Sequence, residues 1–227
     1  GGEETVIHIS SIFHAGAVLE GCRAMRRLIA VSSTGVFSRH RSLAGKIADA
    51  EGKIESSGVR YTILRPTMIY GSPGDRNISK LIRLINRSRV VPLPAMGRSI
   101  FQPVHVNDLA SCILSSLKTP ESIQKSYNVP GGSAHSLGEI VGIISGLLGK
   151  KVMITPVPYH LAFLAVKIAG ALFPRSPVNV EQIQRLKEDK SFDYSEAARE
   201  LGYNPVLFSE GVSQQIRAMG LRTASQP

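Results

Sequence analysis

Three short apolar segments, separated by stretches with helical spacing, limit the folds open to this chain more than any other feature. The apolar segments are TVIHIS (Thr5–Ser10), RLIAVSS (Arg27–Ser33) and YTILRP (Tyr61–Pro66), and the helical stretches are Ile12–Arg26 and Leu43–Ser57. Apolar strands of this kind are typical of a parallel sheet that is covered on both faces. Strand–helix–strand units in such sheets cross over with a right hand. The order therefore predicts an α/β fold with a doubly wound, Rossmann-like parallel sheet.

The residues after Gly71 alternate less regularly. A turn-rich loop, SPGDRN, precedes a predicted helix over Ile78–Ser88 and the proline-rich segment VVPLPAMG. The next predicted elements are a strand over Gln102–Val106 and a helix that runs to Lys118, with Asn107 or Asp108 as its cap. A strand over Tyr127–Pro130 follows. The helix after it runs through Leu148 and begins with a capping box of Ser136 and Glu139. The last third predicts a strand from Lys151, an apolar helix after Pro158, a polar helix over Val180–Asp189, a helix capped by Ser195 and ended by Gly202, and a final helix started by Ser209.

Composition narrows the class of protein. The 227 residues are 43% hydrophobic and 19% charged, which is typical of a soluble globular chain. Cys22 and Cys112 lie in apolar patterns, so we expect buried thiols, a reducing compartment and a cytoplasmic location. The start of the chain does not resemble a signal peptide, and the apolar run Leu161–Phe173 is too short for a transmembrane segment.

The net charge of +10 indicates an anionic partner. The basic residues are spread along the chain, are not interleaved with stacking aromatic residues, and no Trp is present. We therefore expect an anionic small molecule as ligand and no nucleic acid, and we assign no metal ligands.

Six motifs in register resemble the NAD-dependent epimerase/dehydratase family, the extended and atypical branch of the short-chain dehydrogenases/reductases. They are VIHIS (Val6–Ser10), RRLIAVSSTGVF (Arg26–Phe37), SSGVRYTILRPTMIYG (Ser56–Gly71), FQPVHVNDLA (Phe101–Ala110), YNVPGG (Tyr127–Gly132) and FDYSEAARELGYNP (Phe192–Pro205). The resemblance implies a dinucleotide-binding sheet with a small carboxy-terminal substrate lobe, NAD or NADP as cofactor, and often a nucleotide sugar as substrate. It implies a partial Rossmann-like domain with early substrate-lobe insertions over residues 1–125, a mainly substrate-binding lobe over 126–220 and a disordered tail over 221–227.

The catalytic residues implied by the resemblance form an incomplete set. The family's Ser/Thr corresponds to Ser33, with Thr34 as the alternative, and its lysine is best matched by Lys46, one residue out of register. The tyrosine of the family's Tyr-x-x-x-Lys is missing, because Ser42 stands four positions before Lys46 and His40 six. A strand-end serine can also serve only to satisfy backbone groups, and we expect His40 to be solvated.

The resemblance also implies cofactor contacts at the ends of three strands. They are Ile9, Ser10 and Ser11 after the first strand, Ser32 with Ser33 after the second, and Pro66 and Met68 after the third. Carboxyl ends of parallel strands are where open sheets bind ligands, although ordinary strand-end packing is an alternative. The glycine fingerprint that grips the pyrophosphate does not occur in this sequence, which begins at what resembles the family's fourth strand. We therefore expect either a fragment or weak dinucleotide binding, and an unpaired edge on the first strand.

One basic stripe is visible without the family. Arg76, Lys80, Arg83 and Arg87 are spaced by four, three and four residues, which predicts one helix face. A stripe of this kind is suited to a pyrophosphate, and its first three residues form the candidate substrate-binding set together with Arg98 and Gln102. A solvated basic face is the alternative, and the family's substrate arginine falls on Phe101.

Three hypotheses follow. In the first, the chain is an oxidoreductase or epimerase that acts by hydride transfer, and a nucleotide sugar is one candidate for its substrate. Alternatively, it is a non-catalytic dinucleotide-binding or assembly protein similar to the accessory subunit of respiratory complex I, or an interaction domain that has lost the cofactor. A two-fold helical interface is common in the family, and the sequence leaves open whether the predicted helices Ile12–Arg26 and Leu43–Ser57 form one and so build a homodimer.

Overall fold

The computed structural model describes residues 4–22, 24–94, 97–158 and 188–224. The chain divides into two compact units whose segments interleave along the sequence. Unit 1 comprises Gly1–Ile69, Pro103–Gly132 and Phe192–Val206, and unit 2 comprises Tyr70–Gln102, Ser133–Ser191 and Leu207–Pro227. The functional division predicted at residue 125 is not tested by these units and stays a prediction.

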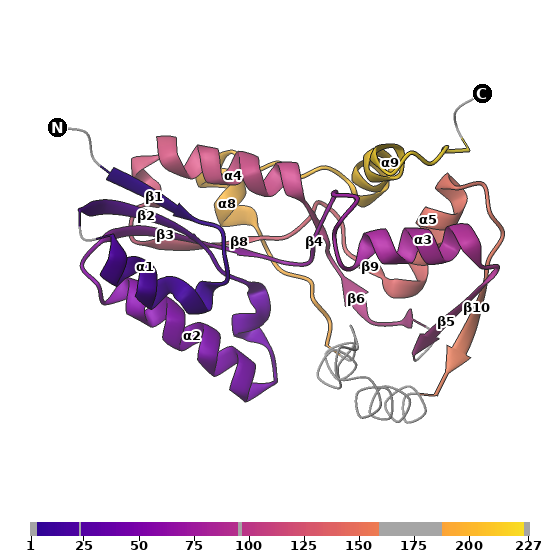
Figure 1. The fold of residues 1–227 in the computed structure, drawn as a ribbon, viewed down its shortest axis with the longest axis horizontal. Helices are drawn as coiled ribbons and strands as arrows, with labels where there is room; N and C mark the ends of the chain where they lie inside the picture. Colours follow the sequence, from indigo (N-terminus) through magenta and orange to yellow (C-terminus); the bar gives the residue numbers. More distant parts are fainter. Residues whose placement is uncertain (1–3, 23, 95–96, 159–187, 225–227) are drawn as a thin grey trace. The chain divides into compact units, whose positions relative to one another are not determined.

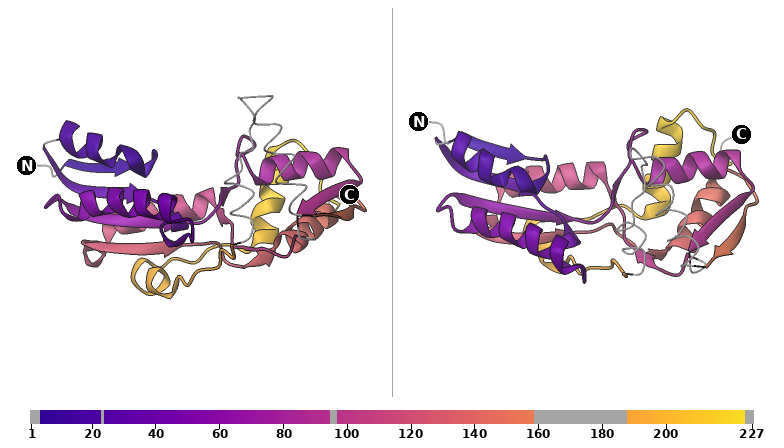
Figure 2. Two further views of the ribbon diagram at one scale, coloured as in Figure 1. Left: turned by 90° about the horizontal axis from the view of Figure 1, so that it is seen from below. Right: turned by 60° about the horizontal axis from the view of Figure 1, so that its bottom comes forward.

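Unit 1 is built on a four-stranded parallel sheet in the order β1-β2-β3-β8 (Figures 1 and 2). The strands are β1 (Glu4–His8), β2 (Met25–Val31), β3 (Arg60–Pro66) and β8 (Lys125–Val129). In register, Val31 lies opposite Leu64, and Pro66 lies opposite Val129. All four carboxyl ends therefore face the same edge, and the predicted doubly wound α/β sheet is confirmed.

Helices cover both faces of this sheet. One face packs against α1 (Ala15–Gly21) and α2 (Arg41–Glu55), and the other against α4 (Val106–Lys118) and α8 (Ser195–Leu201) (Figure 1). Alternate residues of β2 serve the two layers, since Leu28 and Ala30 join the α1/α2 core and Ile29 and Val31 join the α4/α8 core. This two-sided burial explains the continuous apolar run in the sequence.

The end predicted for the helix over Ile12–Arg26 is wrong, because α1 ends at Gly21. The chain forms a 3-10 turn, η1 (Ile12–His14), then α1, and is already in β2 at Met25. The strand predicted from Arg27 therefore begins two residues earlier, and the buried Arg27 lies inside it. The Arg27 Nη2 group donates to the Ser116 carbonyl (2.7 Å) and to Ser122 Oγ (3.0 Å), which gives this end of the guanidinium partners inside the core.

Other boundaries in unit 1 also differ from the predictions. No single strand covers Gln102–Val106, because β7 (Val104–His105) passes directly into α4. The cap of α4 is His105, whose ring accepts a hydrogen bond from the Asn107 amide (3.4 Å), and not Asn107 or Asp108. Helix α8 is preceded by Tyr194 instead of being capped by Ser195, but it ends at the left-handed Gly202 as predicted. The unit also contains η2 (Thr34–Phe37) and η4 (Pro120–Ser122).

The described residues of unit 2 form three helices and short strands. They are α3 (Ile78–Arg87), β5 (Val90–Pro94), β6 (Ile100–Phe101), β9 (His135–Ser136), α5 (Leu137–Leu147), β10 (Met153–Val157) and α9 (Phe208–Ala218), and the chain enters the unit within β4 (Ile69–Tyr70). The capping box of Ser136 and Glu139 is confirmed. Helix α9 already includes Ser209, so the predicted start there is wrong.

The proline-rich segment Val90–Pro94 is a strand that the sequence reading missed. It pairs with β10 in a two-stranded parallel sheet, with Val91 and Leu93 buried and Pro92 exposed. Proline is tolerated in a strand with a free edge, where no ladder hydrogen bond is needed from it. The two helices predicted between Pro158 and Asp189 lie almost wholly outside the described residues. In the predicted tail, the Ala224 amide donates to the Leu147 carbonyl (2.7 Å).

Candidate functional site

Two strand ends are joined at the carboxyl edge of the unit 1 sheet. The Ser32 amide donates to the Leu64 carbonyl (2.7 Å), and Thr34 Oγ1 donates to the Pro66 carbonyl (3.3 Å). The Val104 amide in turn donates to the Met68 carbonyl (2.9 Å). These bonds bring together two predicted groups, and we call residues Ser32–Thr34 and Pro66–Met68 the strand-end site.

Ser33 keeps a free donor at this site. Its extended backbone ends β2, and its Oγ accepts a hydrogen bond from the Gly35 amide (3.0 Å), which caps η2. A serine hydroxyl has one proton and two lone pairs, so the proton remains able to donate to a ligand. Thr34, by contrast, is buried and donates its proton to Pro66. The geometry therefore favours Ser33 over Thr34 as the donor.

Ser32 belongs to a buried charged network that the sequence reading missed. Its hydroxyl donates to Glu51 Oε1 (2.5 Å), and Glu51 forms a bidentate ion pair with Arg65, with Nη2–Oε2 at 2.7 Å and Nε–Oε1 at 3.1 Å. The Glu51 side chain is only 4% exposed, and that of Arg65 is 18% exposed. The Arg65 guanidinium also lies 5.6 Å from the centre of the Phe37 ring. The sequence did carry a signal, because Glu51 stands in the apolar stripe of α2, between Ile47 and Ile54.

Lys46 is not joined to this site. It lies on the exposed side of α2, and in the described part of the chain neither a hydrogen bond nor an ion pair involves it. Ser42 is exposed as well, and His40 stands at the N-cap position of α2 without a side-chain cap bond. No hydrogen bond among the described residues joins Lys46 to Ser33, and the catalytic roles predicted for the two residues stay predictions.

The residues after β1 reach the same edge, because β1 is parallel to β2. Ile9 is 72% exposed, and Ser10 and Ser11 are exposed too. The Ser11 carbonyl accepts hydrogen bonds from His8 Nε2 and from the His14 amide, both at 3.0 Å. The edge thus presents hydroxyl donors beside apolar side chains, an arrangement suited to a flat ring that carries a polar substituent.

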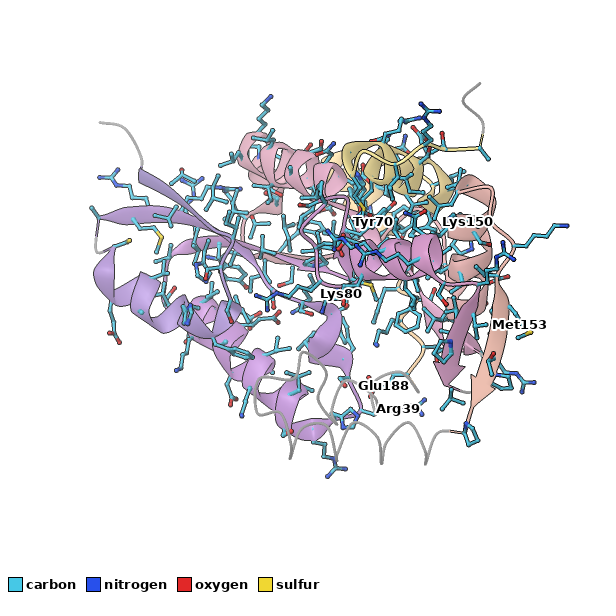
Figure 3. All side chains as sticks on the ribbon, turned by 45° about the vertical axis from the view of Figure 1, so that its right-hand side comes forward. Arg39, Tyr70, Lys80, Lys150, Met153 and Glu188 are labelled. Carbon is cyan, nitrogen blue, oxygen red and sulfur yellow. The ribbon has the colours of Figure 1, made fainter. Side chains whose placement is uncertain are left out.

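The basic stripe lies in unit 2, and the structure changes its composition. Helix α3 begins at Ile78, so Arg76 lies in the preceding loop instead of on the helix. The Arg83 guanidinium donates to the Pro73 carbonyl (2.6 Å) and to Ser79 Oγ (3.2 Å), and is therefore used locally. Lys80 projects from α3, where Figure 3 labels it.

The remaining members of the candidate substrate set differ in exposure. Arg87 and Arg98 are exposed, whereas Gln102 is buried. The amino end of α3 is already occupied, because the Asp75 carboxylate accepts from the amides of Asn77 (2.8 Å) and Ser79 (3.2 Å). An anion would therefore have to bind the exposed side chains and not the helix end.

A second glutamate in unit 1 joins β8 to α8. Glu200 Oε2 accepts from Lys125 Nζ (2.7 Å) and from Tyr127 Oη (2.6 Å). These two hydrogen bonds lower the pKa of Glu200 to about 2. Burial, and then the bond to Glu200, raise the pKa of Tyr127, so this phenol stays protonated. Since β8 runs from Lys125 to Val129 and Val129 lies at the carboxyl edge, the cluster lies toward the other end of the sheet.

Burial also decides the state of two further groups. It lowers the pKa of His105, which keeps the ring neutral and able to accept the cap bond, although Asp108 opposes the shift. Burial raises the pKa of Cys112 to about 12, so this thiol is unreactive. Cys112 is buried as predicted, whereas Cys22 is only half-buried, and both are free thiols. Among the described residues, no helix is both long and apolar enough to cross a membrane.

Comparison with known proteins agrees with the resemblance seen in the sequence. The model of the NAD dependent epimerase/dehydratase family matches residues 46–130. UDP-glucose 4-epimerase of Vibrio cholerae is 26% identical over 165 residues, which are 72% of this chain and 48% of that protein. The mitochondrial NADH dehydrogenase [ubiquinone] 1 alpha subcomplex subunit 9 of Arabidopsis thaliana is 28% identical over 174 residues, or 72% of this chain and 43% of that protein.

Solved structures share the fold. UDP-glucuronic acid 4-epimerase from Bacillus cereus, in complex with UDP-glucuronic acid and NAD, superposes with a TM-score of 0.69 at 16% identity, over 92% of this chain and 67% of that one. The matched regions span about half or less of the curated relatives. The predicted resemblance to the epimerase/dehydratase family is thus confirmed, and so is the Rossmann-like fold.

Proposed function

We propose that this relative of the NAD-dependent epimerase/dehydratase family binds NAD or NADP at the strand-end site and acts on a nucleotide sugar. The observation that carries the proposal is the junction of the β2 and β3 ends. It holds Ser33, with its free hydroxyl proton, at the sheet edge where open parallel sheets bind ligands. The family match supplies the cofactor class, and nucleotide-sugar enzymes recur among the relatives.

The residues at this edge fit a nicotinamide ring. Ile9 and Met68 would contact its apolar face, and Ser10 and Ser11 offer exposed hydroxyls to its polar substituent. Such a cofactor, when bound, supplies hydride transfer. The contribution of this chain is to hold Ser33 so that its hydroxyl donates to an oxygen of the sugar, which orients that oxygen and stabilises developing negative charge on it.

The substrate-binding part of the proposal concerns unit 2. Within unit 2, Arg76, Lys80 and Arg98 would bind a pyrophosphate group, because all three are exposed cations. Arg83 and Gln102 would have positioning roles, since Arg83 is bonded to its own loop and Gln102 is buried.

A second candidate is a non-catalytic dinucleotide-binding or assembly protein. The exposure of Lys46 favours it, because a lysine that does not meet Ser33 cannot complete the family's catalytic set. The similarity to the complex I subunit of Arabidopsis thaliana supports the same candidate.

Titration of the 227-residue chain with NADH and NADPH, followed by nucleotide fluorescence, tests the binding step. Turnover of UDP-glucose in the presence of NAD then separates the two candidates. For an enzyme, we expect Ser33→Ala to lower kcat by roughly 100-fold, which is typical of the loss of a positioned hydroxyl donor. Ser38→Ala is the matched control, because its hydroxyl accepts from the His40 amide outside the strand-end site. Binding without turnover would favour the assembly protein. The binding is expected to be weak, since the sequence does not contain the glycine fingerprint, and absence of even weak binding at millimolar nucleotide would contradict both candidates.

A further inference from the structure

Glu51 holds two strand ends at once. Its Oε1 accepts from Ser32, just after β2, and from Arg65, near the end of β3, while its Oε2 accepts the short bond from Arg65 Nη2. The carboxylate itself comes from α2, so three elements meet at one buried group. Charge-assisted hydrogen bonds of this kind are short and about twice as strong as neutral ones.

We propose that Glu51 is a positioning residue for the strand-end site, an inference that rests on the proposed function. The segment after β2 has left the sheet ladder, and its bonds to β3 are those of Ser32 to Leu64 and of Thr34 to Pro66. Glu51 adds an anchor from the helix layer on the other side of Ser32. Without it, the residues that carry the Ser33 hydroxyl would be held to the sheet by two neutral bonds.

The anchor also determines the direction of Ser33. Successive side chains of an extended segment point to opposite faces, and Ser33 has extended dihedral angles (φ −159°, ψ 144°). Ser32 points to the α2 face, where Glu51 accepts its proton. Ser33 is thereby directed away from α2, with its oxygen bonded to the Gly35 amide and its proton available.

A purely structural role for Glu51 would be to neutralise the buried Arg65. Three variants separate this role from positioning. Ser32→Ala removes the serine anchor but keeps the Glu51–Arg65 ion pair. Glu51→Gln removes the charge but keeps an oxygen that can accept from Ser32. Glu200→Gln is the matched control, because it weakens a comparable network in the same unit, toward the other end of the sheet.

The measurements are amide hydrogen exchange of Gly35 and the dissociation constant for NADH, with the melting temperature recorded for each variant. We expect Gly35 to exchange about 10-fold faster in Ser32→Ala, which loses the charge-assisted bond to Glu51, and about 3-fold faster in Glu51→Gln, which keeps a neutral bond to Ser32. We expect the dissociation constant to rise by similar factors. In Glu200→Gln both quantities should equal those of the wild type, even where its melting temperature falls as far as that of Glu51→Gln.

The possible results divide cleanly. Unchanged Gly35 exchange in both Ser32→Ala and Glu51→Gln overturns the inference, as does equal acceleration in the Glu200→Gln control. Faster exchange with an unaltered NADH affinity also overturns it, because the anchor would then not serve the site. If the wild type fails to bind any dinucleotide although the exchange pattern appears, the proposed function falls, whereas the anchoring of the Ser33 segment by Glu51 stands.

Discussion

Two glutamates of unit 1, Glu51 and Glu200, join a helix to the sheet in different ways. Glu51 is 4% exposed and accepts from Arg65 and from the hydroxyl of Ser32, which has just left the β2 ladder. Glu200 is 18% exposed and accepts from Tyr127 and Lys125, which lie inside the paired strand β8. The two strand residues that bind Glu200 are already fixed by the ladder, and so is Arg65 in β3, whereas Ser32 beside Glu51 has left the ladder. Glu51, at the carboxyl edge of the sheet, can therefore order a ligand-binding segment, whereas Glu200, beside β8, fixes a helix to the sheet.

The largest effect is expected when Glu51 loses its arginine partner, Arg65. Arg65→Ala leaves the buried Glu51 carboxylate without its cation, which costs about 3–5 kcal/mol in the free energy of unfolding. Urea denaturation measures this loss. Arg199→Ala is the matched control, because this arginine is 69% exposed and lies 3.4 Å from Glu200 Oε1. We expect little change there, as is usual for exposed ion pairs. A loss below about 1 kcal/mol in Arg65→Ala would contradict the view that Glu51 is a buried, paired charge.

The second prediction uses pH to separate the two glutamates. The pKa of Glu200 is lowered from 4.5 to about 2, so the folded state binds this proton less readily than the unfolded state. The resulting stabilisation is complete above about pH 4.5 and is lost as the pH falls toward 2. Glu200→Gln should therefore be less stable than the wild type at pH 6, and this difference should shrink between pH 4.5 and 2. The effect is smaller than that of Arg65→Ala, because Glu200 is more exposed.

The measurement is the unfolding midpoint in urea at several pH values in this window. Tyr127→Phe is the companion variant, since it keeps Lys125 as the partner of Glu200 and should lose only part of the pH dependence. A stability difference between Glu200→Gln and the wild type that stays constant down to pH 2 would exclude Glu200 as the titrating group.

The sequence predicted the elements that follow from local periodicity. The β2–α2–β3 order, Gly202 as a helix end and the capping box of Ser136 are examples. It failed where pairing between distant segments overrides local preference. The proline-containing β5 is a strand because it pairs with β10, and the buried Arg27 has partners for its Nη2 in Ser116 and Ser122, which are far away in the sequence.

The candidate site shows the same limit. The strand ends could be predicted, because parallel strands place their carboxyl ends at one edge. The pairing of Glu51 with Ser32 and Arg65 could not, since it joins residues 19 and 14 positions apart. A charged residue in the apolar stripe of α2 signalled only that a buried partner must exist. Which of the two hydroxyls, Ser33 or Thr34, keeps its proton likewise depends on the distant Pro66 carbonyl.

The smallest predicted effect concerns the Phe37 ring beside Arg65. The Phe37 ring is 51% exposed, lies 5.6 Å from the Arg65 guanidinium, and has its centre 5.7 Å from that of Phe192. A cation over an exposed ring contributes about 0.5–1 kcal/mol, so Phe37→Leu should lower the free energy of unfolding by that amount. Phe13→Leu is the control, since Phe13 is 52% exposed in the same unit. A double-mutant cycle with Arg65→Lys isolates the stacking energy from other effects of the leucine. A coupling energy of zero between Phe37 and Arg65 would mean that the ring does not help to orient Arg65. A coupling energy of about 0.5 kcal/mol or more would mean that the Phe37 ring helps to hold the guanidinium that binds Glu51.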